Sequence, residues 1–284
     1  MKWSPAGRGS GKQLIRWLGD NEWKHIPLSS RIKYAAGLPA FGKIANGRLW
    51  TRKDRGEITG ALYISRYGVV LPVFDKDRSN ADETQFLKKM LVPRENDLFS
   101  IIGMKERVLN IENHTGKPVS DYVSYRMLIG SGPIPSGQDE PPGLSIHQAE
   151  FSDFDKLWKL EKAYQIEEVL RNEHIFDERS TRLHFQNTLK TQLVYYVLLG
   201  GRAVAKAGTN SRGYLYDQIG GVFVIPELRG YGFGTAVMNR LLSTIAGEGR
   251  RPCLFVNKSN LPALKLYKNL AFRDMGAFRI SYYH

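Results

Sequence analysis

The chain has 284 residues, of which 42% are hydrophobic, and carries a formal net charge of +13 at pH 7. Its single cysteine, Cys253, excludes an intrachain disulfide and is typical of a reducing compartment. The longest apolar stretch, Ile58 to Phe74, is interrupted by an arginine, a glycine and a proline, which excludes a membrane span. Met1 to Gln13 is charged and glycine-rich, so we expect no signal peptide and a cytoplasmic protein.

The first half of the chain predicts helices and strands of its own. We expect a helix over Lys12 to Leu18, then helix or loop as far as Tyr34. Five strands and two helices are expected after it: strands Gly47 to Trp50, Gly60 to Ser65, Val69 to Phe74, Leu98 to Ile102 and Ser124 to Ile129, and helices Asp82 to Met90 and Lys105 to Asn113.

A stretch of linker composition divides the chain. Gly130 to Gly143 contains four glycines and four prolines in 14 residues. We therefore predict a domain over residues 1–130, a linker over 131–143 and a second domain over 144–284. Each domain of about 140 residues is large enough to bury a core of its own.

The second half begins with a predicted strand, Leu144 to Ala149, and an amphipathic helix, Phe154 to Leu170. Asp177 is the expected N-cap of a second helix, Glu178 to Thr191. Further strands are expected over Gln192 to Leu199, Gly201 to Ala207 and Val222 to Ile225. Cys253 lies within the next apolar strand, Pro252 to Val256, and is predicted to be a buried, inert thiol.

Arg229 to Gly234, Arg-Gly-Tyr-Gly-Phe-Gly, joins a strand directly to a helix that begins at Thr235. Alternate residues lack a Cβ, so the loop can adopt positive φ angles and its N–H groups can approach a ligand closely. The N-terminus of the following helix and the charge of Arg229 both favour an anion. A tight turn without a ligand has the same spacing, and the loop alone does not distinguish the two.

A second motif decides the interpretation. Asn260 to Phe272 reads Asn-Leu-Pro-Ala-Leu-Lys-Leu-Tyr-Lys-Asn-Leu-Ala-Phe, with Asn260 as the expected N-cap of a short helix. Together, Arg-x-x-Gly-x-Gly and Asn-x-x-Ala-x-x-Leu-Tyr resemble the two signatures of the GNAT superfamily of N-acetyltransferases, with Ala271 where glycine is usual. The resemblance covers residues 144–284, and the order of elements in the first half resembles the degenerate N-terminal copy of tandem GNAT proteins.

The resemblance implies an α+β class, with a three-layer fold in which helices flank a mixed central sheet, present in two copies in tandem. It also implies acetyl-CoA as co-substrate and no metal. The pantetheine arm is expected along Val222, Phe223 and Val224, where this strand and the Cys253 strand separate in relatives. The expected cofactor-binding residues are these three together with Arg229, Gly230, Tyr231, Gly232, Phe233, Gly234, Thr235, Asn257 and Asn260.

Tyr267 occupies the position at which the family carries a tyrosine directed at the CoA sulfur, and it is the implied general acid for the thiolate. Some relatives carry a glutamate base where this chain has Gln218, which cannot take a proton. Asp217 is adjacent but belongs to the opposite face of the sheet. Proton removal from the amine through ordered water, Glu161, Glu167 or Glu168 therefore stays open.

The resemblance places Glu167 and Glu168 on the helix that borders the acceptor site, where they are candidate substrate-binding residues for a cationic amine. Lys206 and Asn210 are interpreted as surface residues. The six histidines show no ligand-type spacing and no Cys-x-x-Cys occurs, so no metal site is expected.

Residues 1–55 contain twelve Lys or Arg and three acidic residues, a net charge of +9. The chain is predicted to be an N-acetyltransferase that acts on a small-molecule or peptide amine by direct transfer in a ternary complex. Two alternatives stay open: a non-catalytic CoA-binding module, favoured by Gln218, and a nucleic-acid-binding protein that uses the basic first half. No nucleic-acid-binding motif accompanies that charge, which disfavours the second alternative.

Overall fold

The computed structural model describes residues 2–7, 10–35, 46–74, 81–131, 144–170 and 176–283. Residues 132–143, which form most of the predicted linker, lie outside these ranges. No helix in the described part of the chain has the length and apolar character that a bilayer crossing requires.

The first half contains six strands and four α-helices in the described ranges. They are β1 Lys2–Pro5, α1 Ser10–Leu18, α2 Ile26–Ala35, β2 Gly47–Asp54, β3 Glu57–Ser65, β4 Val69–Phe74, α3 Ala81–Leu91, β5 Ser100–Met104, α4 Lys105–Glu112 and β6 Asp121–Gly130. Two 3₁₀ segments, η1 Gly19–His25 and η3 Val92–Asp97, extend α1 and α3.

The second half repeats this content. Its elements are β7 Ser145–Gln148, α5 Phe154–Tyr164, α6 Glu178–Thr191, β8 Val194–Leu199, β9 Arg202–Arg212, β10 Tyr216–Val224, α7 Phe233–Gly247, β11 Arg251–Asn257, α8 Leu261–Asn269 and β12 Phe272–Tyr282. A π-helical turn, η5 Gln165–Val169, continues α5, and two short 3₁₀ turns are η4 Phe151–Asp153 and η7 Pro226–Leu228. Asp177 and Asn260 cap α6 and α8 as predicted, each accepting from an N–H three residues later.

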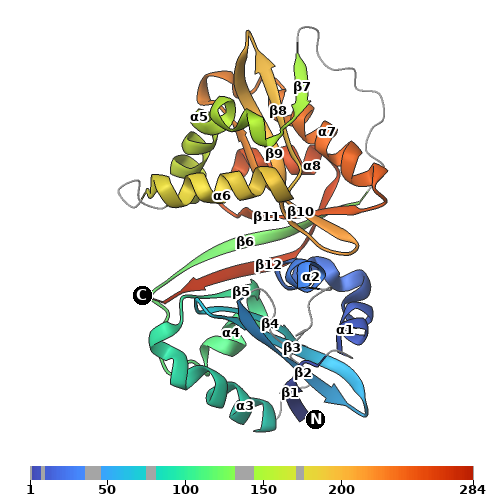
Figure 1. Ribbon diagram of the computed structural model, residues 1–284, viewed down its shortest axis with the longest axis vertical. Helices are drawn as coiled ribbons and strands as arrows, with labels where there is room; N and C mark the ends of the chain where they lie inside the picture. The colour runs from blue at the N-terminus through green and yellow to red at the C-terminus, as the bar shows by residue number, and fades with distance from the viewer. Residues whose placement is uncertain are drawn as a thin grey trace.

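All twelve strands form one sheet, in the order β1-β2-β3-β4-β5-β12-β6-β11-β10-β9-β8-β7. If each strand from β1 to β6 is matched with the strand six numbers later, β1 with β7 and β6 with β12, the order is the same when it is counted from either edge of the sheet. The two last strands are exchanged: β12 pairs with β5 of the first half, and β6 pairs with β11 of the second. Figure 1 shows β6 and β12 side by side between the two halves. The topology is that of a fold present twice.

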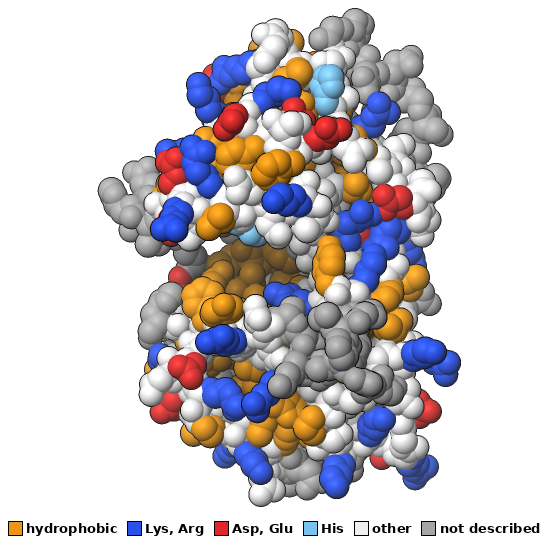
Figure 2. All heavy atoms as spheres, in the orientation of Figure 1, with side chains coloured by type: hydrophobic (Ala, Val, Ile, Leu, Met, Phe, Trp, Pro, Cys, Tyr) orange, Lys and Arg blue, Asp and Glu red, His pale blue; other side chains and the backbone are white. Residues whose placement is uncertain are grey.

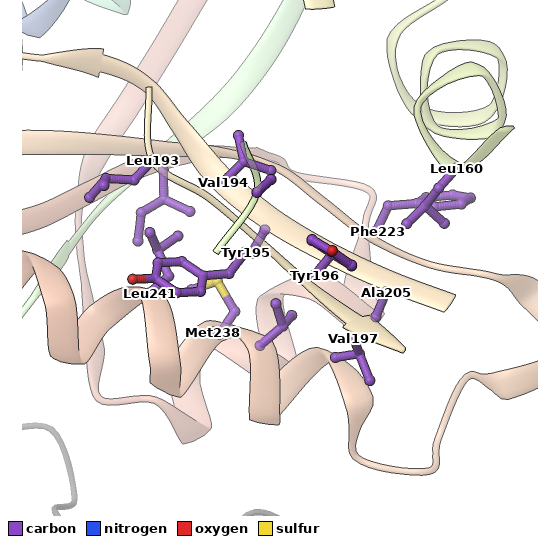
Figure 3. Packing of buried hydrophobic residues seen from close by; sticks show 14 of the residues in the cluster. Leu160, Leu193, Val194, Tyr195, Tyr196, Val197, Ala205, Phe223, Met238 and Leu241 are labelled. Atoms are coloured by element: carbon purple, nitrogen blue, oxygen red, sulfur yellow. The ribbon is translucent and has the colours of Figure 1, made fainter. Parts of the chain in front are cut away.

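Helices cover both faces of the sheet, as expected for a three-layer α+β protein. In the second half, α7 packs on one face of β8 and β9, while α5 packs on the other face of β9. Figure 3 shows Met238 and Leu241 of α7 beside Tyr195, and Leu160 of α5 beside Phe223. The part of the sheet beside the glycine loop, Arg229 to Gly234, therefore lies between two packed layers of helices.

The halves are also joined by a buried carboxylate. Glu22 of η1 is 2% exposed and accepts hydrogen bonds from the backbone N–H groups of Tyr214, Leu215 and Tyr216. A charged group at this depth is stable because three donors solvate it. The first half therefore supports the start of β10.

Most expected elements are present, with shifted ends. The strand Val69 to Phe74 and the helix Glu178 to Thr191 have the predicted bounds. The helix expected over Phe154 to Leu170 is wrong in its last turn, because regular α-helix ends at Tyr164 and a π turn follows. The strand β1 was not predicted, because it has only four residues and two of them, Lys2 and Ser4, are polar. It is a strand because it pairs with β2.

Candidate active site

The loop between β10 and α7 has the backbone conformation that an anion site requires. Gly230 and Gly232 have φ angles of 86° and 87°, which cost a residue with a Cβ roughly 1–2 kcal/mol. A Cβ at either position would meet no atom within 4 Å, so the loop borders open space. Gly232 is the N-cap of α7 and offers no capping side chain. The first N–H groups of α7 are therefore available to an anion.

The strands β10 and β11 separate beside this loop. Their last parallel partners are Gln218 and Cys253, whereas β10 keeps its pairing with β9 as far as Val224 and Ala205. The separation that the resemblance implied is present. It leaves the edge of β10 from Ile219 onward without a neighbouring strand among the described residues.

The direction of the free backbone groups follows from alternation along β10. The N–H of Ile225 donates to the carbonyl of Val204 on β9 at 3.0 Å. Residues one or three positions from Ile225 direct their main-chain groups to the other edge, so those of Val224 and Val222 face the gap. Consistently, the carbonyl of Val224 accepts from Nε of Arg229 at 3.1 Å, outside the β9 ladder.

A groove of about 480 Å³ runs along this gap. Ten of the twelve predicted cofactor residues line it, together with the predicted acid Tyr267 and the candidate substrate-binding residue Glu168. The ten are Val222, Phe223, Val224, Arg229, Gly230, Gly232, Phe233, Gly234, Thr235 and Asn260. The loop, the strand and α8 thus meet in one cavity. A linear ligand with a phosphate end and an extended arm fits this arrangement.

Tyr267 projects from α8 into the groove and is 7% exposed. Burial raises the pKa of its phenol, and the neighbouring Tyr164 and Glu168 raise that pKa further. The hydroxyl has no hydrogen-bond partner among the described residues. A protonated phenol on the wall of a groove can serve as a general acid.

The π turn after α5 reaches across to the groove. Glu167 forms an ion pair with Arg229, and Oε2 of Glu168 accepts from the amide of Asn260 at 3.1 Å. Arg229 and Asn260 lie on opposite walls, the loop and the start of α8. Glu167 and Glu168 therefore lie beside the groove, and their contact with an acceptor amine stays a prediction.

Two predicted cofactor residues lie apart from the groove wall. Tyr231 is 73% exposed and does not line the cavity. The Oδ1 of Asn257 accepts from the N–H and the hydroxyl of Ser259, which shapes the turn before α8. Conversely, Pro262, Leu266 and Asn269 of α8 line the groove but were not predicted from the sequence. Their spacing of three and four residues on one helix face was the available signal.

The interpretation of Lys206 as a surface residue is wrong. Lys206 is 4% exposed, because β9 faces α5 at this point, and its Nζ pairs with Oε2 of Glu161 at 2.9 Å. Asn210 is exposed, as expected, and lies four residues further along β9 at the mouth of a second pocket. The alternating pattern of β9 did not show which face would be covered.

Gln218 is 3% exposed, and its Oε1 has no hydrogen-bond partner in the described part of the protein. It lines neither the groove nor the second pocket. Asp217 lies on the opposite face and pairs with Arg212 and Arg250. Cys253 is fully buried, and burial raises its pKa well above the usual value, as predicted for an inert thiol.

The acidic, histidine and cysteine side chains of the described residues form no cluster of three or more suited to a metal ion.

The fold and the groove together define the class: a protein with the GNAT fold in two tandem copies. Comparison with known proteins supports this assignment. Residues 201–280 match the family described as FR47-like protein, and this range contains β9, β10, the loop, α7, β11 and α8. The fold that the resemblance to the GNAT superfamily implied is confirmed by the solved structures. No curated protein matches the chain.

Solved structures resemble the chain over its whole length. A protein from Drosophila superposes with a TM-score of 0.70 at 12% identity, over 99% of this chain and 98% of the other. A GNAT-family acetyltransferase from Colwellia psychrerythraea gives 0.59 at 11% identity, over 100% of both chains. A tandem GNAT protein from the clavulanic acid biosynthesis pathway gives 0.57 at 12% identity, over 99% and 97%. At these identities the similarity establishes the fold.

Proposed function

We propose that the protein transfers an acyl group, acetyl in the simplest case, from coenzyme A to a primary amine in a ternary complex. The observation that carries the proposal is the separation of β10 from β11 beside the glycine loop. It creates a groove with N–H donors at one end and a free strand edge along its side. Bound there, acetyl-CoA would supply an activated thioester.

The residues of the groove suit the separate parts of that molecule. The amides from Gly230 to Thr235 and the start of α7 can hold a diphosphate, because about 1.5–3 kcal/mol is typical of each charge-assisted hydrogen bond. The main-chain groups of Val222 and Val224 can pair with the amides of pantetheine as a neighbouring strand would. Tyr267 would then lie near the sulfur.

The transfer forms a C–N bond and breaks a C–S bond, while the amine loses one proton and the released thiolate gains one. Tyr267 is the proposed donor of the second proton. The raised pKa of its phenol keeps that proton in place at neutral pH. Gln218 cannot accept the first proton, so an ordered water or a carboxylate of α5 and its π turn is required.

Calorimetry with coenzyme A, combined with an assay of thiol release from acetyl-CoA and a panel of amines, tests the proposal. We expect Gly232→Val to abolish CoA binding, since it brings a branched side chain to φ of 87° and fills the loop. Gly249→Val is a matched control. Gly249 also has a positive φ, of 69°, but lies just beyond the other end of α7.

The control variant should lose stability and keep CoA binding. Absence of any heat with the parent protein at millimolar CoA would overturn the assignment. Binding without thiol release for any amine would leave a CoA-binding module instead.

A further inference from the structure

A second pocket, of about 360 Å³, lies between α5, α6 and strands β8 to β10. It shares no lining residue with the groove, but the two cavities meet on β10. Gly220 and Gly221 line the pocket, and the next residue, Val222, lines the groove. Because a strand rises about 3.3 Å per residue, the pocket ends about one residue from Val222, where the strand segment proposed to pair with pantetheine begins.

Glycine is required where the two cavities meet. The pairing of β10 with β9 shifts between Gly220 and Phe223, and Gly221 has a φ of 63°. A Cβ on Gly220 would lie 1.9 Å from the amide nitrogen of Asn210, and a Cβ on Gly221 would lie 3.0 Å from Nζ of Lys206. The bulge therefore brings backbone, an amide and an ammonium group to the same wall of the pocket.

A buried ion pair lies on this wall. Nζ of Lys206 is 2.9 Å from Oε2 of Glu161, and both side chains are 5% exposed. Lys206 also donates to the carbonyl of Gly221 at 3.0 Å, and Gln165 donates to Oε1 of Glu161 at 2.8 Å. Lys206 and the hydrogen bond from Gln165 outweigh burial and lower the pKa of Glu161, so that this carboxylate is ionised at neutral pH.

The remaining polar groups of the pocket are uncharged. Apart from His184, the described lining residues that can carry charge at neutral pH are Glu161 and Lys206, which cancel. Amides and hydroxyls make up the rest: Tyr164, Gln165, Asn187, Thr188, Thr191, Gln192, Thr209 and Asn210. The amides of Asn187 and Asn210 have no hydrogen-bond partner among the described residues. The pocket thus offers one neutralised carboxylate and several neutral hydrogen-bonding groups.

We propose that this pocket binds the acceptor and selects a small monoamine whose other polar groups are uncharged, such as hydroxyls or amides. The inference rests on the proposed acyl transfer. Glu161 accepts a hydrogen bond from the amine, and Asn187 and Asn210 pair with the neutral groups. A second ammonium group finds no free carboxylate among the described residues that line the pocket, because Lys206 already balances Glu161. Polyamines are therefore disfavoured.

The test compares kcat/KM for 2-aminoethanol and 1,4-diaminobutane, with acetyl-CoA and the full chain. The parent should favour 2-aminoethanol. Asn210→Asp gives the pocket a second carboxylate, so the ratio should move towards the diamine by about tenfold, as one charge-assisted hydrogen bond allows. Asn113→Asp, at the exposed C-terminus of α4, is the matched control and should leave the ratio unchanged.

A second variant separates recognition from packing. Glu161→Gln should raise KM for 2-aminoethanol about tenfold while the Kd of CoA stays constant. A lowered melting temperature with unchanged KM would show that the ion pair only fastens α5 to β9, and would overturn this role. A parent that prefers the diamine, or a ratio unmoved by Asn210→Asp, would overturn the proposed selectivity.

If CoA binds but no amine releases thiol, the proposed acyl transfer fails rather than the pocket. Calorimetric titration of the CoA-loaded protein with the same two amines then decides the inference without turnover. Preferential binding of 2-aminoethanol supports it, and preferential binding of 1,4-diaminobutane contradicts it.

Discussion

Tyr267 shows how a short segment fixes the surroundings of one side chain. Asn260 caps α8, Pro262 occupies its first turn, and Tyr267 follows on the face that turns inward. Its ring packs against Phe272, with centroids 5.8 Å apart, and its hydroxyl borders the groove. All of these relations are local in sequence, so the motif alone predicted where this side chain would be.

We expect Tyr267→Phe to lower kcat by about 100-fold, in the range of general acid catalysis. The Kd of CoA should change less than about twofold, because the ring and its packing are retained. An assay of thiol release gives kcat, and calorimetry gives the Kd of CoA. The raised pKa of Tyr267 means that its proton is lost only above its usual range near pH 10, so kcat should show no alkaline decline from this group at lower pH.

Tyr283→Phe serves as the control, since Tyr283 is also buried but belongs to the core cluster of the first half. Equal turnover of Tyr267→Phe and this control would remove Tyr267 from the chemistry.

The surroundings of Lys206, in contrast to those of Tyr267, are set by residues that are distant in the sequence. Its burial depends on α5, whose Glu161 is 45 residues earlier in the chain, and on the bulge at Gly221. The residues next to Lys206 in the sequence predict neither contact. Side chains whose surroundings come from one motif were therefore predictable, while those whose partners come from another element were not.

At the scale of elements, α5 with its π turn connects the two cavities. Glu161 and Gln165 border the second pocket, the proposed acceptor site, while Glu167 and Glu168 contact Arg229 and Asn260 at the groove. A π turn alters the angular position of the residues after it, and such turns occur often at functional sites. Here it directs two consecutive acids to the two walls of the groove. Helical periodicity predicted the helix but not this change of pitch.

We expect Glu167→Gln to strengthen CoA binding by up to about fivefold, since it releases Arg229 from an exposed ion pair worth at most about 1 kcal/mol. Calorimetry at low and high salt checks this, and the difference should shrink at high salt. Glu178→Gln removes an exposed acid of α6 that also forms ion pairs, and is the control. Weaker CoA binding by Glu167→Gln alone would mean that Glu167 holds Arg229 in its binding position.

At the scale of the whole molecule, the exchange of β6 and β12 makes one sheet of two halves. Arg126 of β6 and Asp274 of β12 are paired although 148 residues separate them. Linker composition predicted the division at residues 131–143, and that division stays a proposal. The exchange was not predictable, because both strands satisfy the same apolar pattern in either half, and only pairing across the halves distinguishes the arrangements.

Residues 1–131 and 144–283, produced as separate polypeptides, should therefore fold poorly alone and assemble when co-expressed. The first fragment lacks β12, which pairs with the edge of β5, and the second fragment lacks β6, which pairs with the edge of β11. Affinity purification through a tag on one fragment, followed by gel filtration, checks the assembly. Two monomeric fragments with native circular dichroism would show that the halves are independent domains.

The position of β12 also constrains the order in which the molecule is built on the ribosome. The edge of β5 stays uncovered until residues of β12 have left the exit tunnel, long after β1 to β5 have emerged. For that interval an open edge is available to other nascent chains, which is a hazard for aggregation. Slow translation of the second half would lengthen this exposure, so the biogenesis of the protein should depend more on translation speed and chaperone supply than its final architecture suggests.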